Sequence, residues 1–533
     1  MNTIETLTNK QKNVIMLGLT LSVLLAALDS TIVSTAMKNI TNDLNGLDLF
    51  AWPLTIYMLF STIITPISGK LADTFGRKLF FMIGAITFLV GSVLCGLSQS
   101  MIQLIIFRAI QGLGCGILMA NTFAMIGDIF PPAERAKNSG IAYSAFGLAS
   151  IIGPLLGGTI TDHFGWRWIF YINLPIGFLF ITLILITVPT IKNGSTARRS
   201  VDYAGTAVLI AGLIPMLLAF TWAGKKYQWS SPVIIYMFAF SAIMLIVFGL
   251  IERKAKEPIL PLALFKDRTF RVASTSVFLS NASMFGAVLF IPLFVQVVLG
   301  KNATNSGMAM APLMLSFAIA SMLSGRVISK TGKLKIFAVN GFIITAIGFF
   351  FLTRFDASST ILQINIAMII SGLGIGLNMP VFTLAVQNAF QQNQMGVVTA
   401  AVQFFRNIGG TIASAVFGAI MLSSITNGIK KVDLTQFSSS NPPFDFSTMI
   451  TNPQALTNVN TINAFKEQVP PSAMDDFNKL LLRINDILST SIQQVFMASL
   501  LIAIAAIAIS LLLPNHSIQE KQRQNKSKLN IDR

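Results

Sequence analysis

The sequence predicts an all-α integral membrane protein in which fourteen spanning helices form two related six-helix bundles, with two extra helices inserted between them. Three observations predict this fold. Of the 533 residues, 53% are hydrophobic and 11% are charged, which leaves too little polar surface to cover a soluble globule. Nearly uncharged runs of about 20 residues, the length of a membrane-spanning helix, recur fourteen times. Two glycine-rich segments also repeat at a distance of eight spans.

The apolar runs give the predicted spans and their orientation. The first run lacks the short apolar region and cleavage site of a signal peptide, so it is a retained helix. An even number of spans places both chain ends on one side, and most of the 38 Lys and Arg lie on that side, so both termini are predicted to be cytoplasmic. Abundant Asn, Ile and Lys suggest an AT-rich bacterial genome, so the bacterial cell membrane is the expected location. The spans are 14–36, 50–69, 79–98, 102–127, 138–161, 166–188, 204–222, 232–250, 272–298, 308–325, 336–353, 361–383, 396–423 and 490–513.

Charge and motif content exclude several classes of protein. The net charge of +17 is scattered through short loops at the membrane edges, so anionic lipids are the expected neighbours and no nucleic acid is expected. Cys95 and Cys115 both lie inside spans, which indicates neither a disulfide scaffold nor a metal site. The sequence has no GxxxxGK[ST] loop for direct use of ATP and no clustered nucleophile, base and orienting group, so an enzyme is disfavoured.

An internal repeat sets the organisation of the chain. GKLADTFGRK at 69–78 corresponds to GRVISKTGKL at 325–334, and GLGCG at 112–116 corresponds to GLGIG at 372–376. An eight-helix register makes spans 1 to 6 and 9 to 14 the two halves. Paired bundles of this kind place a substrate cavity at their interface near the bilayer midplane, which predicts a transporter. The predicted parts are an N-terminal bundle (1–190), two inserted helices (191–268), a C-terminal bundle (269–513) with an external loop at 424–489, and a cytoplasmic tail (514–533).

Two opposite charges lie at a common depth in the predicted spans. Asp29 in span 1 and Arg108 in span 4 are each roughly 10 Å below the outer surface at 1.5 Å per residue. With no histidine in any span, Asp29 is the best candidate to bind and release a proton. Burial favours a neutral carboxyl and a nearby Arg108 favours the carboxylate, so helix movement can switch between the two. The alternative is a permanent ion pair that fixes span 1 to span 4.

Other polar side chains within spans are candidates for lining the substrate path. Arg406, in QFFRNIGG of span 13, has no obvious carboxylate partner, and it either extends to the inner headgroups or lines the cavity. Amides within spans line such paths or make ordinary hydrogen bonds between helices, and both readings stay open. The amides are Gln111, Asn121, Asn281, Gln296, Asn378 and Gln403.

The segment GKLADTFGRK contains a turn and several charges. Its glycines, Gly69 and Gly76, permit a tight turn, and the carboxylate of Asp73 can meet the positive end of span 3. Arg77 and Lys78 can pair with Asp73 or with lipid phosphate. A loop that only sets topology is the alternative. Asp128, at the end of span 4, is either an ordinary end residue or a further member of this group, and Asp202 is a plausible N-cap of span 7.

Span 5 contains the stretch SAFGLASIIGPLLGG, which is apolar but rich in small residues. Small side chains at four-residue spacing let a neighbouring helix approach closely, and Pro154 removes a backbone hydrogen bond and bends the helix. A tightly packed bend between the halves would exclude water and stop proton leak, whereas a generic packing face is the alternative. The glycines of this stretch are Gly147, Gly153, Gly157 and Gly158.

The external loop ends in a predicted amphipathic helix. Ser472 and Asp475 form a capping-box pattern, and apolar residues recur at helical spacing from Phe477 to Leu488. The helix should lead into span 14 and either shield the external mouth or lie on the membrane.

These motifs resemble those of a known family. GKLADTFGRK resembles the loop signature of the major facilitator superfamily, and GPxxGG at 153–158 resembles the motif of its exporters. LDSTIVSTAM at 28–37 and WRWIFYINLPIG at 166–177 are similar to the fourteen-helix drug:proton antiporters of the EmrB and QacA type. The resemblance implies a major facilitator fold and a proton-coupled antiporter that exports amphipathic drugs or toxic molecules by alternating access. It implies the proton gradient as energy source and no cofactor.

The resemblance also implies roles for particular residues. The motif RxxQG reads Arg108, Gln111 and Gly112 here, and the arginine and the acidic Asp29 would be associated with coupling. Asp73 and Arg77 would form the centre of a cytoplasmic latch between the halves. Because Ser329 stands in the second copy where Asp73 stands in the first, the latch should not be symmetric.

Several alternatives remain within and beyond transport. One alternative is an exporter or flippase of a specific lipid-like or endogenous metabolite. Another is a solute facilitator without proton coupling, and a third is a nontransporting sensor on a transporter scaffold. A monomer is the expected functional unit. Asp29 is the one carboxylate placed securely within a span. We therefore expect the substrates to be neutral, weakly charged or anionic amphiphiles.

Overall fold

The computed structural model describes residues 7–46, 49–189, 202–224, 226–301, 303–432 and 465–514. Fourteen helices of these residues are long and apolar enough to cross a membrane, as predicted. Their main segments are α1 (Asn9–Asp43), α2 (Trp52–Phe75), α3 (Arg77–Gly96), α4 (Met101–Ile129), α5 (Pro132–Phe164), α6 (Trp168–Tyr171) continued by α7 (Asn173–Thr187), α8 (Tyr203–Trp222), α9 (Pro232–Glu252), α10 (Arg268–Leu293), α11 (Ala303–Thr331), α12 (Leu334–Leu352), α13 (Ile361–Ala389), α14 (Met395–Ile429) and α17 (Met474–Ser510).

Several helices begin at side chains that cap their free backbone N–H groups. Thr8 and Thr360 each form a capping box with a glutamine three residues later, at the starts of α1 and α13. Asp202 accepts a hydrogen bond of 2.8 Å from the N–H of Gly205, which confirms it as the N-cap of α8. Many helices also extend beyond the predicted spans. Because α1 continues to Asp43, the position of Asp29 is nearer the middle of its helix than predicted.

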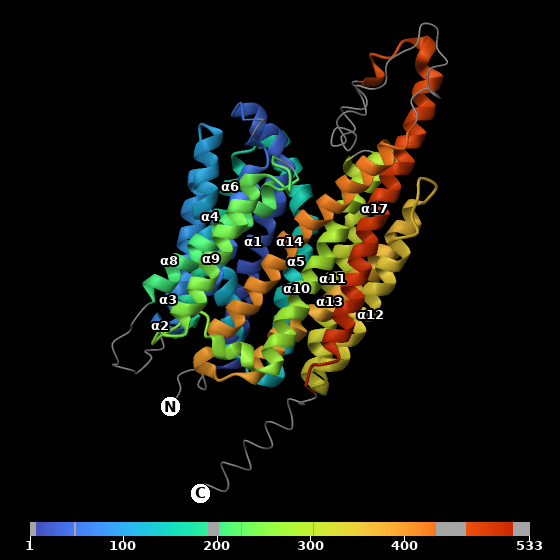
Figure 1. Ribbon diagram of the computed structural model, residues 1–533. Coiled ribbons are helices and arrows are strands. Elements are labelled where there is room, and N and C mark those ends of the chain that lie inside the picture. The colour runs from blue at the N-terminus through green and yellow to red at the C-terminus, as the bar shows by residue number, and fades with distance from the viewer. Residues whose placement is uncertain are drawn as a thin grey trace, which may run out of the picture.

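The helices form two bundles that stand side by side (Figure 1). We call α1 to α7 the N-terminal group and α10 to α17 the C-terminal group. The two ends of the protein are the terminal side, where α1 begins and α17 ends, and the distal side opposite it. Contacts between the groups run mainly from α5 to α11 and from α2 to α14, with further contacts from α4 to α14 and from α5 to α13.

The two inserted helices lie at the edge of this arrangement. α8 and α9 pack against each other, and Ser241 of α9 donates a hydrogen bond of 2.7 Å to the carbonyl of Gly212 in α8. Through α8 the pair contacts α2 and α14. In the most apolar 18-residue stretch of α9 only 17% of the residues are buried, whereas in that of α13 78% are buried. α9 therefore presents most of its apolar surface outward, as a lipid-facing helix does.

The repeated glycines occupy equivalent packing positions in the two groups. A Cβ at Gly112 or Gly116 of α4 would overlap the backbone of α2, and one at Gly114 would overlap that of α3. The glycines at 372–376 in α13 are packed in the same way. A Cβ at Gly372 or Gly376 would overlap α11, and one at Gly374 would overlap α12. The turns match too, since Gly76 has a φ of 110° and Gly332 a φ of 70°, a region that favours glycine. The repeat seen in the sequence is thus a repeat of packing.

The last helix runs far beyond the rest of the bundle on the distal side. α17 begins at Met474, and Phe477, Leu480, Ile484 and Leu488 on one face of this first part are buried. The predicted amphipathic helix is therefore present, and it continues into the last span as one helix (Figure 1). The predicted cap at Ser472 is wrong, because Pro471–Ala473 forms a short 3-10 turn and no side chain caps α17.

Candidate functional site

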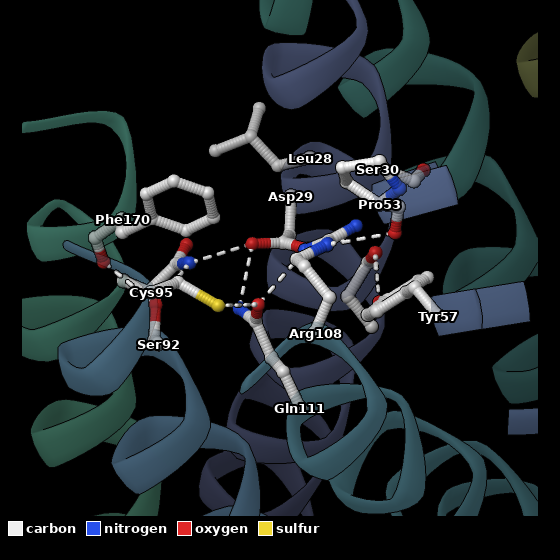
Figure 2. A network of polar contacts seen from close by, with 12 residues as sticks. Leu28, Asp29, Ser30, Pro53, Tyr57, Ser92, Cys95, Arg108, Gln111 and Phe170 are labelled. Atoms are coloured by element: carbon white, nitrogen blue, oxygen red, sulfur yellow. Dashed lines mark hydrogen bonds and ion pairs between the residues drawn. The ribbon is translucent and has the colours of Figure 1, made fainter. Parts of the chain in front are cut away.

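The structure brings Asp29 and Arg108 into direct contact in the middle of the N-terminal group. Nη1 of Arg108 lies 2.6 Å from Oδ2 of Asp29, and both side chains are 0% exposed. Figure 2 shows the two side chains meeting between α1 and α4. A buried pair of this kind stays ionised only if hydrogen bonds satisfy its remaining atoms.

Amides supply those hydrogen bonds to Asp29. Oδ1 of Asp29 accepts from Nε2 of Gln111 at 2.8 Å and from Nδ2 of Asn173 at 2.9 Å. Gln111 in turn accepts from Nη1 of Arg108 at 2.8 Å, and Asn173 donates to Ser92 of α3 at 2.9 Å. The carboxylate therefore connects helices α1, α3, α4 and α7.

Arg108 is held by aromatic rings as well as by its carboxylate. Its guanidinium carbon lies 4.1 Å from the ring centroid of Tyr57 and 6.0 Å from that of Phe170, within the range of cation–π attraction. Nε donates to the carbonyl of Pro53 at 3.3 Å (Figure 2). Nη2 has no hydrogen-bond partner among the described residues. Arg108 thus keeps one buried donor available for a different arrangement of the site.

The residues predicted to form a latch join the two groups on the terminal side of the protein. Asp73 of α2 accepts hydrogen bonds from the backbone N–H groups of Gly396 at 3.1 Å and Val397 at 2.8 Å, in the first turn of α14. Asp73 was expected to contact the N-terminus of span 3, which carries a partial positive charge. It instead contacts the N-terminus of α14, in the C-terminal group. Arg77 forms ion pairs with both Asp73 and Asp128, the latter at 2.6 Å. Asp128 therefore does join this cluster.

Close backbone packing surrounds these charges. A Cβ at Gly69 would overlap the Cβ of Ala400 and the carbonyl of Gly396, so glycine lets α2 and α14 touch at this level. Lys78 lies outside the ion pairs and donates to the carbonyls of Leu185 and Val188 at the end of α7.

A second set of hydrogen bonds joins the groups nearby. Arg135, near the start of α5, donates to the carbonyl of Gln387 at 3.1 Å and to the amide oxygen of Asn388 at 3.3 Å. Gln387 donates to the carbonyl of Phe123 at 2.9 Å. Within the described ranges the second copy of the loop makes no comparable contact through Ser329, which is half-buried and donates to the carbonyl of Arg326 in its own helix. Of the two copies of the loop, the first therefore contacts the other group through its acidic position, and no such contact of the second copy is found among the described residues.

The small residues of α5 pack against helices of both groups. Gly147 packs against Met314 and Phe317 of α11, in the C-terminal group. Gly153 and Gly157 instead pack against Thr31 and Thr35 of α1, in their own group. In this conformation the GPxxGG part of α5 therefore lies against α1 and not between the halves as expected. A Cβ at Gly158 would meet nothing within 4 Å, and Pro154 is exposed.

The remaining candidates differ in where they point. Asn281 of α10 donates to the backbone carbonyl of Arg406 at 2.8 Å, and Gln403 accepts from Nη1 of Arg406 at 3.2 Å, so these three lie together. Asn121 donates to the carbonyl of Ile117 in its own helix.

Two further amides lie elsewhere. With its amide oriented to satisfy its neighbours, Asn378 bonds to Ala338 and Phe342 of α12, within the C-terminal group. Gln296 is half-buried in the π-helical end of α10.

The fold and the buried site define a polytopic membrane transporter of two pseudo-repeated bundles. The model of the Major Facilitator Superfamily matches residues 19–414, and the chain belongs to this family. As a member, it is a multi-pass membrane transporter and not an enzyme, and it needs no cofactor.

Two bacterial relatives match over nearly their whole length. The chain is 38% identical to the multidrug transporter protein MdtP of Bacillus subtilis, covering 97% of this chain and 96% of the relative. It is 37% identical to multidrug resistance protein 3 of the same organism, covering 95% and 96%.

Two solved structures share the fold. The human organic anion transporter MFSD10 (TETRAN) superposes with a TM-score of 0.59 at 12% identity, over 92% of this chain and 99% of the other. The proton:xylose symporter XylE bound to 6-bromo-6-deoxy-D-glucose gives 0.54 at 15% identity, over 88% and 98%.

Several residues of the site were missed by sequence reasoning. Asn173, Ser92 and Tyr57 all contact the Asp29–Arg108 pair directly or through one hydrogen bond. Asn173 is a polar residue in a long apolar run, and this signal could have found it. Ser92 and Tyr57 give no such signal, because a hydroxyl in a membrane helix can bond to many different groups; here they donate to the carbonyls of Phe170 and Ala26.

Proposed function

We propose that this protein is a proton-coupled antiporter that exports amphipathic molecules from the cytoplasm of a bacterial cell. In this proposal the terminal side faces the cytoplasm and a monomer is the functional unit. The names of the two Bacillus relatives support export of drugs. The buried Asp29–Arg108 pair is the observation that carries proton coupling, because a fully enclosed carboxylate in a membrane protein marks a proton or ion path.

In this proposal the contacts on the terminal side belong to a state whose cytoplasmic entrance is shut. The latch around Asp73 and the bonds of Arg135 hold the two groups together on the terminal side. In an exporter, this state follows release of the substrate and precedes return to the cytoplasmic side. Proton entry from outside is the event expected to drive that return.

A mechanical path leads from Asp29 to the other group. A proton on Asp29 removes its charge, and Arg108 then lies buried without a counter-ion, which is unfavourable in this packing. A shift of α1 would be passed to α5, because Gly153 and Gly157 pack directly on α1. The middle of α5 packs on α11 through Gly147. Protonation can thus bias the rocking of one group against the other.

The test uses purified protein in liposomes with an imposed pH gradient and a pH-sensitive dye inside. Cationic, neutral and anionic amphiphiles are added to wild type, Asp29→Asn and the control Asp43→Asn. Asp43 lies on the same helix, but its ion pair with Arg167 at 2.8 Å is half exposed. We expect at least one compound to dissipate the gradient with wild type and the control, and about tenfold more slowly or not at all with Asp29→Asn.

Two results would contradict the proposal. If Asp29→Asn moves protons as fast as wild type, Asp29 has no coupling role and its pair with Arg108 is structural. If compounds cross the membrane with no proton movement in wild type, the protein is a facilitator.

A further inference from the structure

A second buried arginine lies in the C-terminal group without a carboxylate. Arg406 of α14 is 6% exposed, yet none of the ion pairs within the described ranges involves it. Its guanidinium donates to two neutral oxygens, that of Gln403 at 3.2 Å and the carbonyl of Met379 at 3.5 Å. A buried cation normally has a carboxylate or a full set of hydrogen bonds.

Two other arginines of the described residues have carboxylate partners, whereas the buried Arg135 forms no ion pair there and donates to three neutral oxygens at 3.0 to 3.3 Å. Arg108 has Asp29, and Arg77 has both Asp73 and Asp128. Arg406 differs from all three, because it has no carboxylate partner in the described ranges and only two hydrogen bonds, at 3.2 and 3.5 Å.

Arg406 lies at the seam between the two groups. Its guanidinium carbon is 4.6 Å from the ring centroid of Tyr143, which belongs to α5 of the N-terminal group. The hydroxyl of Tyr143 is 2.9 Å from that of Thr383 in α13, and its ring stacks on Phe123 at 4.3 Å. A cation held against an aromatic face of the opposite group will change its surroundings when the groups rock.

The depth of this contact matches that of a transporter's binding site. Tyr143 and Arg406 each lie eleven residues after the first residue of their helices, and both helices begin on the terminal side. At 1.5 Å per residue this is roughly 16 Å along the helix, which is close to the midplane of a hydrocarbon core of about 30 Å. Substrate sites of paired-bundle transporters lie at this level and at this interface.

We propose that Arg406 is the charge-recognising residue of the substrate site, and that the protein prefers amphiphiles with one anionic group beside an aromatic or aliphatic body. The anionic group would pair with the guanidinium, which presents two parallel N–H groups suited to a carboxylate. The rings of Tyr143 and Phe123 would receive the apolar body. This inference rests on the proposed export function and gives it a substrate class.

Binding to purified full-length protein in a nonionic detergent tests the preference without any proton gradient. The probes are three naphthalene compounds that differ only in one group, a carboxylate, a primary carboxamide or an ammonium. In wild type we expect the carboxylate to bind at least about tenfold more tightly than the other two.

Variants assign this preference to Arg406. Arg406→Gln should weaken carboxylate binding about tenfold or more and change carboxamide binding less than about threefold. Arg406→Lys keeps the charge but not the paired N–H groups, and should weaken carboxylate binding about threefold or more. Arg354→Gln is the matched control, because Arg354 also rests on an aromatic ring, that of Phe350 at 5.2 Å, but is exposed. It should bind all three probes as wild type does.

Several outcomes overturn the inference. If wild type binds the ammonium compound as tightly as the carboxylate compound, or more tightly, the inference is overturned without any variant. The inference is also overturned if Arg406→Gln keeps the wild-type preference for the carboxylate compound. If that variant fails to fold, the inference is overturned when Arg406→Lys binds the carboxylate compound as tightly as wild type does. Because no gradient is present, these results are separate from the Asp29 experiment, whose failure would overturn proton coupling and leave the binding preference intact.

Discussion

The carboxylate of Asp73 accepts a 2.8 Å hydrogen bond from the backbone N–H of Val397, so a residue of one bundle caps a helix of the other. The first turn of a helix has unpaired N–H groups and a partial positive charge, and α14 obtains its cap from α2. Arg77 holds the Asp73 carboxylate in place through its own ion pair. The free energy of this cap is available only while the terminal side is closed.

Removing this cap should favour opening of the terminal side. Asp73→Ala loses two charge-assisted hydrogen bonds, together worth about 3 to 6 kcal/mol in the closed state. We expect the backbone amides of residues 395–400 to exchange hydrogen for deuterium at least about tenfold faster, as measured by mass spectrometry.

The second copy of the loop provides the control for this prediction. Ser329 occupies the position equivalent to Asp73, but it is half-buried and bonds only within α11 among the described residues. Ser329→Ala should leave exchange at 395–400 unchanged. Equal exchange in Asp73→Ala and wild type would mean that the cap adds nothing to closure.

Two glycines of α5 should respond oppositely to the same substitution. A Cβ at Gly153 would overlap the side chain of Thr31, whereas one at Gly158 would meet nothing within 4 Å. Overpacking of a tight interface costs about 1 to 3 kcal/mol. Gly153→Ala should therefore lower the thermal unfolding temperature in detergent and slow transport, and Gly158→Ala should change neither. A reversed order would show that the α1–α5 packing is looser than the structure has it.

Asn173 should stabilise the site although it carries no charge. Asn173→Ala removes the bonds to Asp29 and Ser92 and leaves a buried carboxylate with fewer donors, at a cost of about 1 to 3 kcal/mol. The unfolding temperature should fall by several degrees. Asn340→Ala, at an exposed position of α12, is the matched control and should stay within about 0.5 kcal/mol of wild type. Equal unfolding temperatures for Asn173→Ala and wild type would place the stability of the site in Arg108 and Gln111 alone.

The sequence was most informative where one residue type in a membrane has few physical options. Long uncharged runs have to be helices, because lipid offers no partner for free backbone groups. Asp29 and Arg108 could be paired from sequence because two opposite charges at one depth in hydrocarbon attract strongly. The repeated GLGCG and GLGIG segments predicted the pseudo-symmetry because close helix packing requires glycine at those positions.

Pairings between segments far apart in the chain were not predictable in this way. The positive end that Asp73 meets was assigned to span 3, since that helix follows it directly, but the structure uses α14, more than 300 residues later. The small-residue ridge of α5 was expected between the halves, and its Gly153 and Gly157 face α1. A small surface suits any close neighbour, so its composition does not identify the partner.

By itself, therefore, the sequence determined the number of spans, the repeat and the buried charges of this protein, because the cost of polar groups in lipid acts on each segment separately. Tertiary structure alone decided which helix ends, rings and amides those charges meet. Tyr143 lies against Arg406, and Asn173 against Asp29, because two bundles dock in one particular register. That register depends on the summed packing of many neutral side chains, and no single motif encodes it.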